Sequence, residues 1–154
     1  MALSINPYIE NKERIHLIGI GGVSMSALGE LLLSLGVPVS GSDRLKTDVT
    51  ARLESLGAKI TYEHKAENVE GASLIVRTAA VHDDNPEIVR AHALDIPVME
   101  RAEAWGHLMR DYDNVVCLAG THGKTTSTSM MTLMTMEAGL DPTVMVGSNL
   151  PAIG

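Results

Sequence analysis

Short segments rich in apolar residues alternate with segments of helical pattern along the first two thirds of the chain. The apolar segments are 14–20, 37–40, 58–61, 73–77 and 96–99, and the segments with helical spacing or helix-capping residues are 24–35, 48–56, 86–93 and 101–110. Strands that alternate with helices pair in parallel and place the helices on both faces of one sheet. The pattern therefore predicts an α/β fold: a Rossmann-like, doubly wound and mostly parallel sheet.

A second strand-loop-helix unit follows the polar segment 111–114. It comprises an apolar run at 115–119, a glycine loop at 120–124, a helical segment at 125–137 and a further apolar run at 143–146. Charged residues become sparse here, since Lys124 is the only lysine or arginine after the polar segment. We therefore predict a domain boundary near Asp111, with one domain over 1–111 and a second part over 112–154. The methionines between 130 and 136, and Cys117, are expected to fill the core of that second part.

The glycine-rich segment 19–24 joins the first predicted strand to the first predicted helix, where dinucleotide-binding folds hold a pyrophosphate. Glycines let the backbone approach the phosphates, and the helix N-terminus supplies free N–H groups and a favourable dipole. Ser24 stands at the third glycine position of G-x-G-x-x-G, so the match to a nicotinamide-dinucleotide loop is partial. A tight turn between strand and helix explains the same glycines without a ligand. The candidate binding residues of this loop are Gly19, Ile20, Gly21, Gly22 and Ser24.

Asp43 follows the second predicted strand, where such folds place a carboxylate that accepts a hydrogen bond from a ribose hydroxyl. The alternative is that Asp43 caps a turn or the helix that follows it. The sequence favours neither interpretation over the other.

The segment 120–126, GTHGKTT, follows an apolar run and opens a helix, which is the setting of a phosphate-binding loop. Such a loop surrounds phosphates with backbone N–H groups, while a lysine reaches the β and γ oxygens and a hydroxyl binds Mg²⁺. Lys124 and Thr125 supply the last two groups, although Gly120 lies closer to Lys124 than the pattern G-x-x-x-x-G-K-[ST] requires. The candidate ATP-binding residues are Gly120, Thr121, His122, Gly123, Lys124, Thr125 and Thr126.

Composition narrows the classes of partner. The formal net charge is −7, from 12 lysines and arginines against 19 aspartates and glutamates, and offers no basic surface for nucleic acid or an anionic membrane. Apolar runs fall short of the about 20 residues of a membrane span, and the N-terminus lacks a signal-peptide pattern. The single cysteine excludes an intramolecular disulfide. We expect a cytoplasmic protein, and the sequence leaves its oligomeric state open.

Four segments together carry a resemblance to a known family. They are 16–43 (HLIGIGGVSMSALGELLLSLGVPVSGSD), 78–88 (TAAVHDDNPEI), 96–103 (IPVMERAE) and 119–127 (AGTHGKTTS). In this order they resemble the Mur ligase family, whose phosphate loop is similarly shortened. The resemblance implies that 1–111 binds the UDP part of a substrate, with Thr78 and Ala79 as further contacts, and that 112–154 is the incomplete beginning of a central ATP-binding domain. The segment after Arg77 departs from the family, which has a serine-rich loop there.

The resemblance also implies a reaction. The family's activity would be ATP-dependent ligation in peptidoglycan precursor synthesis, here of L-alanine to UDP-N-acetylmuramic acid through an acyl phosphate. Lys124 would neutralise charge on the transferred phosphoryl group, and Thr125 would bind Mg²⁺. Because the family's remaining domains are not among these 154 residues, we expect the chain alone to bind the UDP sugar with negligible ligase turnover.

Other functions remain open. One is an NAD(P)-dependent oxidoreductase domain, which the first glycine loop and Asp43 favour and the second loop opposes. Another is a non-catalytic nucleotide-sugar-binding module. The third is the related ligase that joins a peptide to the same sugar nucleotide.

Overall fold

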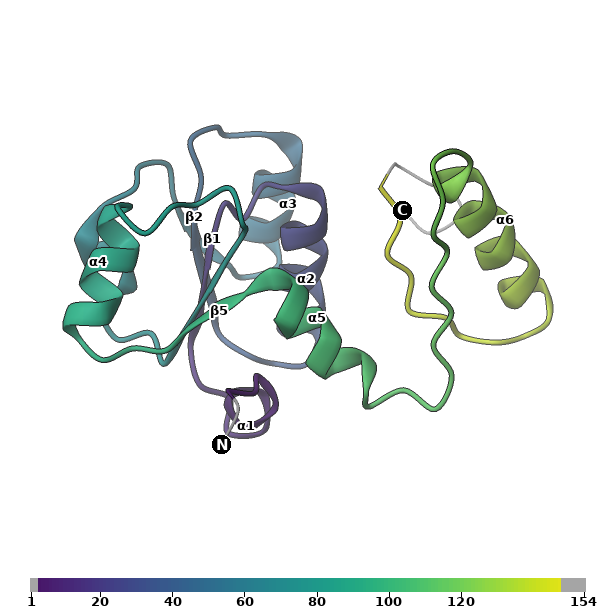
Figure 1. Ribbon diagram of the computed structural model, residues 1–154, viewed down its shortest axis with the longest axis horizontal. Coiled ribbons are helices and arrows are strands. Elements are labelled where there is room, and N and C mark those ends of the chain that lie inside the picture. Colours follow the sequence, from purple (N-terminus) through teal and green to yellow (C-terminus); the bar gives the residue numbers. More distant parts are fainter. Residues whose placement is uncertain (1–2, 148–154) are drawn as a thin grey trace. The chain divides into compact units, whose positions relative to one another are not determined.

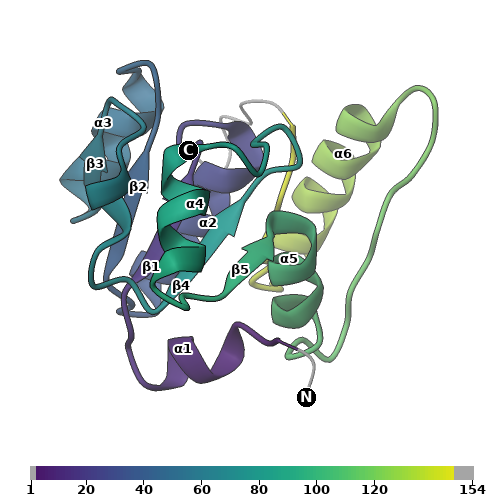
Figure 2. The ribbon, with the colours of Figure 1, turned by 60° about the vertical axis from the view of Figure 1, so that its left-hand side comes forward.

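A computed structural model describes residues 3–147 of the protein, and the chain divides into two compact units, Met1–Asp113 and Asn114–Gly154 (Figure 1). In the first unit, five strands form one parallel sheet with the order β3-β2-β1-β4-β5 (Figure 2). The strands are β1 (Ile15–Ile18), β2 (Val39–Ser42), β3 (Lys59–Thr61), β4 (Leu74–Arg77) and β5 (Val98–Glu100). The predicted fold class is confirmed.

Four helical segments connect these strands: α2 (Val23–Ser34), α3 (Asp48–Ser55), the short 3₁₀ helix η1 (Ala66–Val69) and α4 (Pro86–Ala93). Helix α1 (Asn6–Glu10) precedes β1, and α5 (Arg101–Met109) follows β5. The predicted strands and helices of this unit are present, with small shifts at their ends. The sequence did not predict α1 and η1, because elements this short are too brief to show a helical period.

Alternate side chains of each strand point to opposite faces of the sheet and fill two cores. One core joins Leu17 of β1 and Val76 of β4 to residues of α2, α3 and α5. The other joins Ile18 and Ile75 to residues of η1 and α4. Figure 1 shows α2 and α3 on one side of the strands and α4 on the other, which is the doubly wound arrangement.

In the second unit, the described residues 114–147 contain one helix, α6 (Lys124–Glu137). Within the part of the chain that is described, residues 115–119 and 143–146 form no strand, so the two strands predicted there are wrong. An apolar run becomes a strand only when another segment pairs with its N–H and C=O groups, and among residues 3–147 none pairs with either run.

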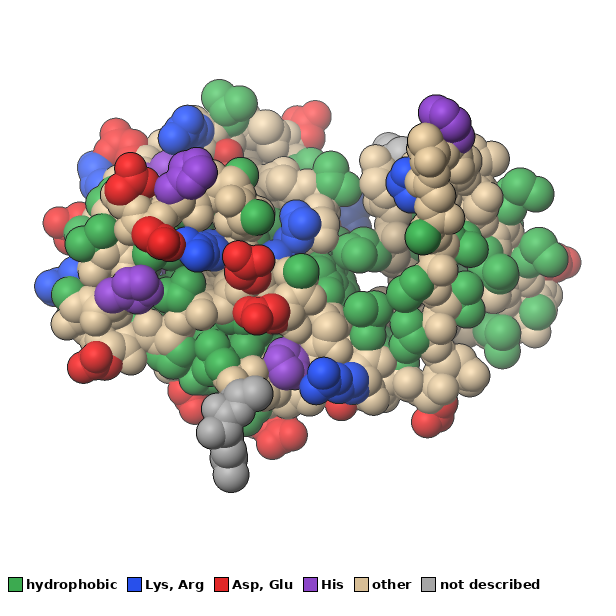
Figure 3. Space-filling model, viewed as in Figure 1, with side chains coloured by type: hydrophobic (Ala, Val, Ile, Leu, Met, Phe, Trp, Pro, Cys, Tyr) green, Lys and Arg blue, Asp and Glu red, His purple; other side chains and the backbone are tan. Residues whose placement is uncertain are grey.

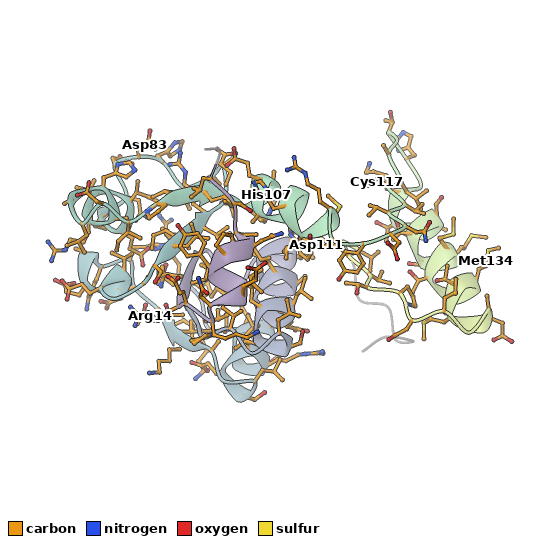
Figure 4. The ribbon with its side chains drawn as sticks, turned by 90° about the horizontal axis from the view of Figure 1, so that it is seen from below. Arg14, Asp83, His107, Asp111, Cys117 and Met134 are labelled. Carbon is orange, nitrogen blue, oxygen red and sulfur yellow. The ribbon has the colours of Figure 1, made fainter. Side chains whose placement is uncertain are left out.

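Side chains of the second unit are largely exposed, so the predicted methionine core is also wrong. Met130 and Met134 of α6 are 59% and 66% exposed, and Cys117 is exposed as well. Green hydrophobic side chains cover much of the visible surface of this unit in Figure 3, and Met134 projects outward from α6 in Figure 4. Only Thr132 of α6 is buried.

Candidate functional site

The strand order places the candidate site of the first unit at one edge of the sheet. From β1 the chain proceeds outward to β2 and β3, then returns to place β4 on the other side of β1. Ligands of open α/β sheets bind outside the carboxyl ends of the strands at this reversal. Residues 19–24 follow β1, Asp43 follows β2, and Thr78 and Ala79 follow β4. The structure therefore brings all the predicted first-unit residues to the same edge.

The four amides of residues 19–22 all donate hydrogen bonds within the protein. Gly19 N and Ile20 N donate to Ser42 O (2.8 and 3.1 Å), Gly21 N to Asp43 Oδ2 (2.8 Å) and Gly22 N to Gly19 O (3.1 Å). These four amides are therefore already paired within the protein, whereas the N–H groups predicted to hold a phosphate are those of the helix N-terminus. An anion at this loop has to displace one of these bonds or bind at the first turn of α2, where the helix dipole favours negative charge.

Two of the candidate residues are required by the conformation of the loop. Gly19 has a φ of +78°, a left-handed conformation that favours glycine. A Cβ atom at Gly21 would lie 2.8 Å from Asp43 Oδ2 and 3.1 Å from Thr50 Cγ2, so a side chain does not fit there. Ile20 is fully buried, and its side chain packs in the core instead of facing a ligand.

Asp43 caps the turn at the end of β2. Its Oδ2 accepts from Gly21 N, and its Oδ1 accepts from Arg44 N and Leu45 N (2.7 and 3.2 Å). The turn-capping interpretation is therefore confirmed. Contact with a ribose stays a prediction. A ribose hydroxyl would have to donate to a carboxylate that already accepts from three backbone amides.

The loop after β4 is held by Arg77. This guanidinium donates to the backbone oxygen of Val81 (3.3 Å) and forms an ion pair with Asp83, which lowers the pKa of the Asp83 carboxyl. Thr78 is half-buried and Ala79 is exposed. Arg77 is thus a cation at the carboxyl edge of the sheet that the sequence did not identify as a candidate.

Glu87, near the start of α4, is the main feature that sequence reasoning missed. Its fully buried carboxylate has four side-chain partners, which are His16 Nε2 (3.2 Å) and Asn68 Nδ2 (2.8 Å) on Oε1, and Ser42 Oγ (2.8 Å) and His64 Nδ1 (2.7 Å) on Oε2. Burial raises the pKa of Glu87, but the hydrogen bonds outweigh that effect and hold the pKa below its ordinary value.

A signal for this cluster existed in the sequence. Asn85 and Pro86 predict a helix N-terminus, which the structure confirms, since Asn85 Oδ1 accepts from Glu87 N (2.9 Å). Glu87 then lies next to Ile88 on the buried face of α4, and His16 lies among the apolar residues of β1. Because buried charged groups need partners, a glutamate on the buried face of a helix and a histidine in a buried strand indicate a buried polar pair.

The loop 120–126 lies at the N-terminus of α6. Gly123 precedes the helix with a left-handed φ of +78°, and Lys124 is the first helical residue. The Lys124 ammonium donates to the backbone oxygens of Gly120 and Thr121, so it closes the loop on itself. Thr125 is exposed in the first helical turn, as are Thr121, His122 and Thr126 in and beside the loop. This cation, hydroxyl and helix N-terminus are the groups that an ATP phosphate with Mg²⁺ requires.

Among residues 3–147, no three His, Cys, Asp or Glu side chains form a group that could hold a metal ion. No described helix is long and apolar enough to cross a membrane.

Comparison with known proteins relates the chain to a family of ligases. A family profile described as "Mur ligase family, catalytic domain" matches residues 14–113. The UDP-N-acetylmuramate–L-alanine ligase of Clostridium novyi is 46% identical over 151 residues, which cover 98% of this chain and 33% of that protein. The corresponding ligase of Geobacter sp. is 51% identical over 92% of this chain and 31% of that protein. The chain thus spans about a third of the length of these curated relatives.

Solved structures give the same relationship. The UDP-N-acetylmuramate-alanine ligase of Thermotoga maritima superposes with a TM-score of 0.85 at 38% identity, covering 91% of this chain and 33% of that chain. A second solved structure is the UDP-N-acetylmuramate:L-alanyl-gamma-D-glutamyl-meso-diaminopimelate ligase of Neisseria meningitides. It superposes with a TM-score of 0.84 at 27% identity, covering 92% of this chain and 45% of that chain. With the profile match over residues 14–113, these similarities establish that the chain belongs to the Mur ligase family.

Proposed function

We propose that the first unit binds UDP-N-acetylmuramic acid at the carboxyl edge of its sheet, and that residues 120–126 bind the phosphates of ATP. The chain would serve a ligase that joins L-alanine to this sugar nucleotide, as the names of the relatives state for those proteins. The observation that carries the proposal is the convergence of the loops after β1, β2 and β4 at the reversal of strand order. Such an edge is where nucleotides bind in open α/β sheets.

Bound ATP with Mg²⁺ would supply the phosphoryl group that activates the sugar carboxylate. Lys124 would exchange its bonds to Gly120 and Thr121 for phosphate oxygens and neutralise their charge. The hydroxyl of Thr125 would provide one oxygen ligand to Mg²⁺, and the amides at the N-terminus of α6 would donate to the phosphates.

Titration calorimetry with separate ligands tests the first half of this proposal. UDP-N-acetylmuramic acid and UDP are expected to bind the chain, and NAD is not. The single tryptophan, Trp105, offers a second signal, because its Nε1 donates to Ser24 O (3.3 Å) at the start of α2. Tighter binding of NAD than of the UDP sugar would support the oxidoreductase alternative instead.

The related ligase that joins a peptide to the sugar nucleotide differs from an L-alanine ligase in its second substrate. The names of both kinds of solved relative include UDP-N-acetylmuramate, so binding of the sugar nucleotide does not distinguish them. The test is a whole ligase that contains this sequence, supplied with ATP, the UDP sugar and either L-alanine or the peptide. Formation of ADP with L-alanine alone is the expected result.

A further inference from the structure

One buried carboxylate connects five segments around the candidate nucleotide site. Glu87 belongs to α4, and its partners belong to β1 (His16), the end of β2 (Ser42), the segment after β3 (His64) and η1 (Asn68). These partners lie between 19 and 71 residues away from it in sequence. Glu87 and His16 are buried, whereas the side chain of His64 is 18% exposed. The cluster therefore reaches from the interior to the surface at His64 and at Asn68, which is also only half-buried.

The carboxylate determines which nitrogen of each histidine carries the proton. An ionised carboxylate accepts hydrogen bonds and cannot donate, so His16 Nε2 and His64 Nδ1 must both be N–H donors to it. His16 Nδ1 then accepts from the hydroxyl of Ser40, which lies 2.9 Å away. A neutral His64 consequently carries a lone pair on Nε2. The two histidines are thus held in opposite tautomers by the same carboxylate.

His64 lies close to the glycine loop through Ser42. The hydroxyl of Ser42 is 3.2 Å from His64 Nδ1, and the backbone oxygen of the same residue accepts from Gly19 N and Ile20 N. Among the residues that the structure describes, no hydrogen bond to His64 Nε2 is recorded. The partly exposed ring therefore presents an acceptor at the edge where the nucleotide is proposed to bind.

We propose that Glu87 is a positioning residue for nucleoside recognition: it fixes His64 as the Nδ1–H tautomer, so that His64 Nε2 accepts a hydrogen bond from an N–H or O–H group of the nucleoside. This inference rests on the proposed binding of a UDP sugar. Phosphate oxygens are acceptors and gain nothing from a second acceptor, whereas the base and the ribose carry N–H and O–H donors. The role of Glu87 is accordingly specific to the nucleoside part of the ligand.

Two probes separate positioning from a general loss of structure. UDP carries the nucleoside, and inorganic pyrophosphate carries only the phosphates. In Glu87→Gln, whose amide cannot accept from all four donors, UDP should bind about tenfold more weakly, while the affinity for pyrophosphate should be unchanged. Glu70→Gln is the matched control, because Glu70 also ties down α4, through Arg90 Nη2 at 2.8 Å, but is exposed. It should bind both probes as the unaltered chain does.

The imidazole ¹⁵N resonances of the unaltered chain provide a second readout. They should show His64 protonated on Nδ1 and His16 protonated on Nε2. If Glu87→Gln does not fold, His64→Ala replaces it in the binding measurements, with the same selective loss for UDP. A His64 protonated only on Nε2, an equal loss of UDP and pyrophosphate, or an unchanged affinity for UDP would each overturn the proposal. If the unaltered chain binds neither UDP nor the UDP sugar, the proposed function itself fails.

Discussion

The carboxylate of Asp43 holds the glycine loop from the neighbouring strand, since Oδ2 lies 2.8 Å from the backbone nitrogen of Gly21. The same side chain accepts from the amides of Arg44 and Leu45. The carboxylate therefore fixes the relative position of the loops after β1 and β2 before any ligand binds. This contact makes Asp43 a structural residue of the loop as well as a candidate ligand contact.

Replacement of Asp43 by alanine should destabilise the first unit. The substitution leaves three backbone amides without their acceptor, and hydrogen bonds to charged groups contribute about 1.5–3 kcal/mol each at most sites, so we expect a loss of about 1–3 kcal/mol after partial replacement by water. Chemical denaturation monitored by Trp105 fluorescence measures the free energy of unfolding. Asp84→Ala, in the exposed turn before α4, is the control and should change it by less than about 0.5 kcal/mol. Equal effects of the two substitutions would contradict the capping role.

Addition of a methyl group at Gly21 should disturb the same contact. The new Cβ atom would lie 2.8 Å from Asp43 Oδ2, so Gly21→Ala should reduce the free energy of unfolding by about 1–3 kcal/mol. Gly106→Ala in α5 tests whether the effect is local, because a Cβ atom at Gly106 meets nothing within 4 Å. That variant should gain about 0.5–1 kcal/mol, since alanine favours a helix over glycine. One thermal or urea denaturation series measures both changes in the free energy of unfolding, which should have opposite signs.

Glu87 should make the stability of the first unit depend on pH in the acid range. The pKa of this carboxyl is lowered from its ordinary value of 4.5, so its contribution to stability is fully present above that pH and is lost as the pH falls through the lower, folded-state pKa. His16 and His64 face the carboxylate within the cluster, and Asn68 and Ser42 complete it.

Urea midpoints measured from about pH 6 down to about pH 3 test this dependence. The unaltered chain should lose stability more steeply below pH 4.5 than Glu87→Gln, which has no carboxyl to protonate. Glu70→Gln, with its exposed ion pair, should follow the unaltered chain. Parallel curves for the unaltered chain and Glu87→Gln would show that the folded-state pKa of Glu87 is not lowered.

The exposed methionines of α6 should be replaceable by polar residues without loss of stability in the first unit. Met130→Gln combined with Met134→Gln keeps good helix formers and should change the free energy of unfolding of that unit by less than about 0.5 kcal/mol. Binding of 8-anilinonaphthalene-1-sulfonate should fall, because less apolar surface is accessible. Met25→Ala, in the buried core, provides the contrast and should cost about 2–5 kcal/mol. A large loss in the double variant would mean that these methionines are buried.

Ligase turnover by the chain alone should be negligible. The chain corresponds to 33% and 31% of the two curated relatives, so about two thirds of their length has no counterpart in it. The measurement is release of ADP from ATP that depends on both L-alanine and UDP-N-acetylmuramic acid. Lys124→Ala is the control for contaminating ATPases, since it removes the predicted phosphate contact. Alanine-dependent ADP release by the unaltered chain, abolished in Lys124→Ala, would contradict the expectation.

The sequence by itself determined the five strands of the first unit and its longer helices, α2 to α5. The N-terminus of α4 at Asn85 and Pro86, the glycines at 19 and 21, and the start of α6 beside Lys124 were all readable, because each depends on residues within a few positions of one another. The sequence also placed the glycine loop and Asp43 directly after the first and second predicted strands.

Only the tertiary structure decided the contacts between distant segments. Glu87 meets His16 across 71 positions and Ser42 across 45, and no local pattern encodes such a meeting. Ser42 and Asp43 approach the glycine loop from another strand and accept from three of its amides, which no pattern within the loop predicts. The apolar run at 115–119 has strand-forming residues and yet forms no strand in the described structure, because hydrogen-bond pairing needs a partner that the run itself does not contain.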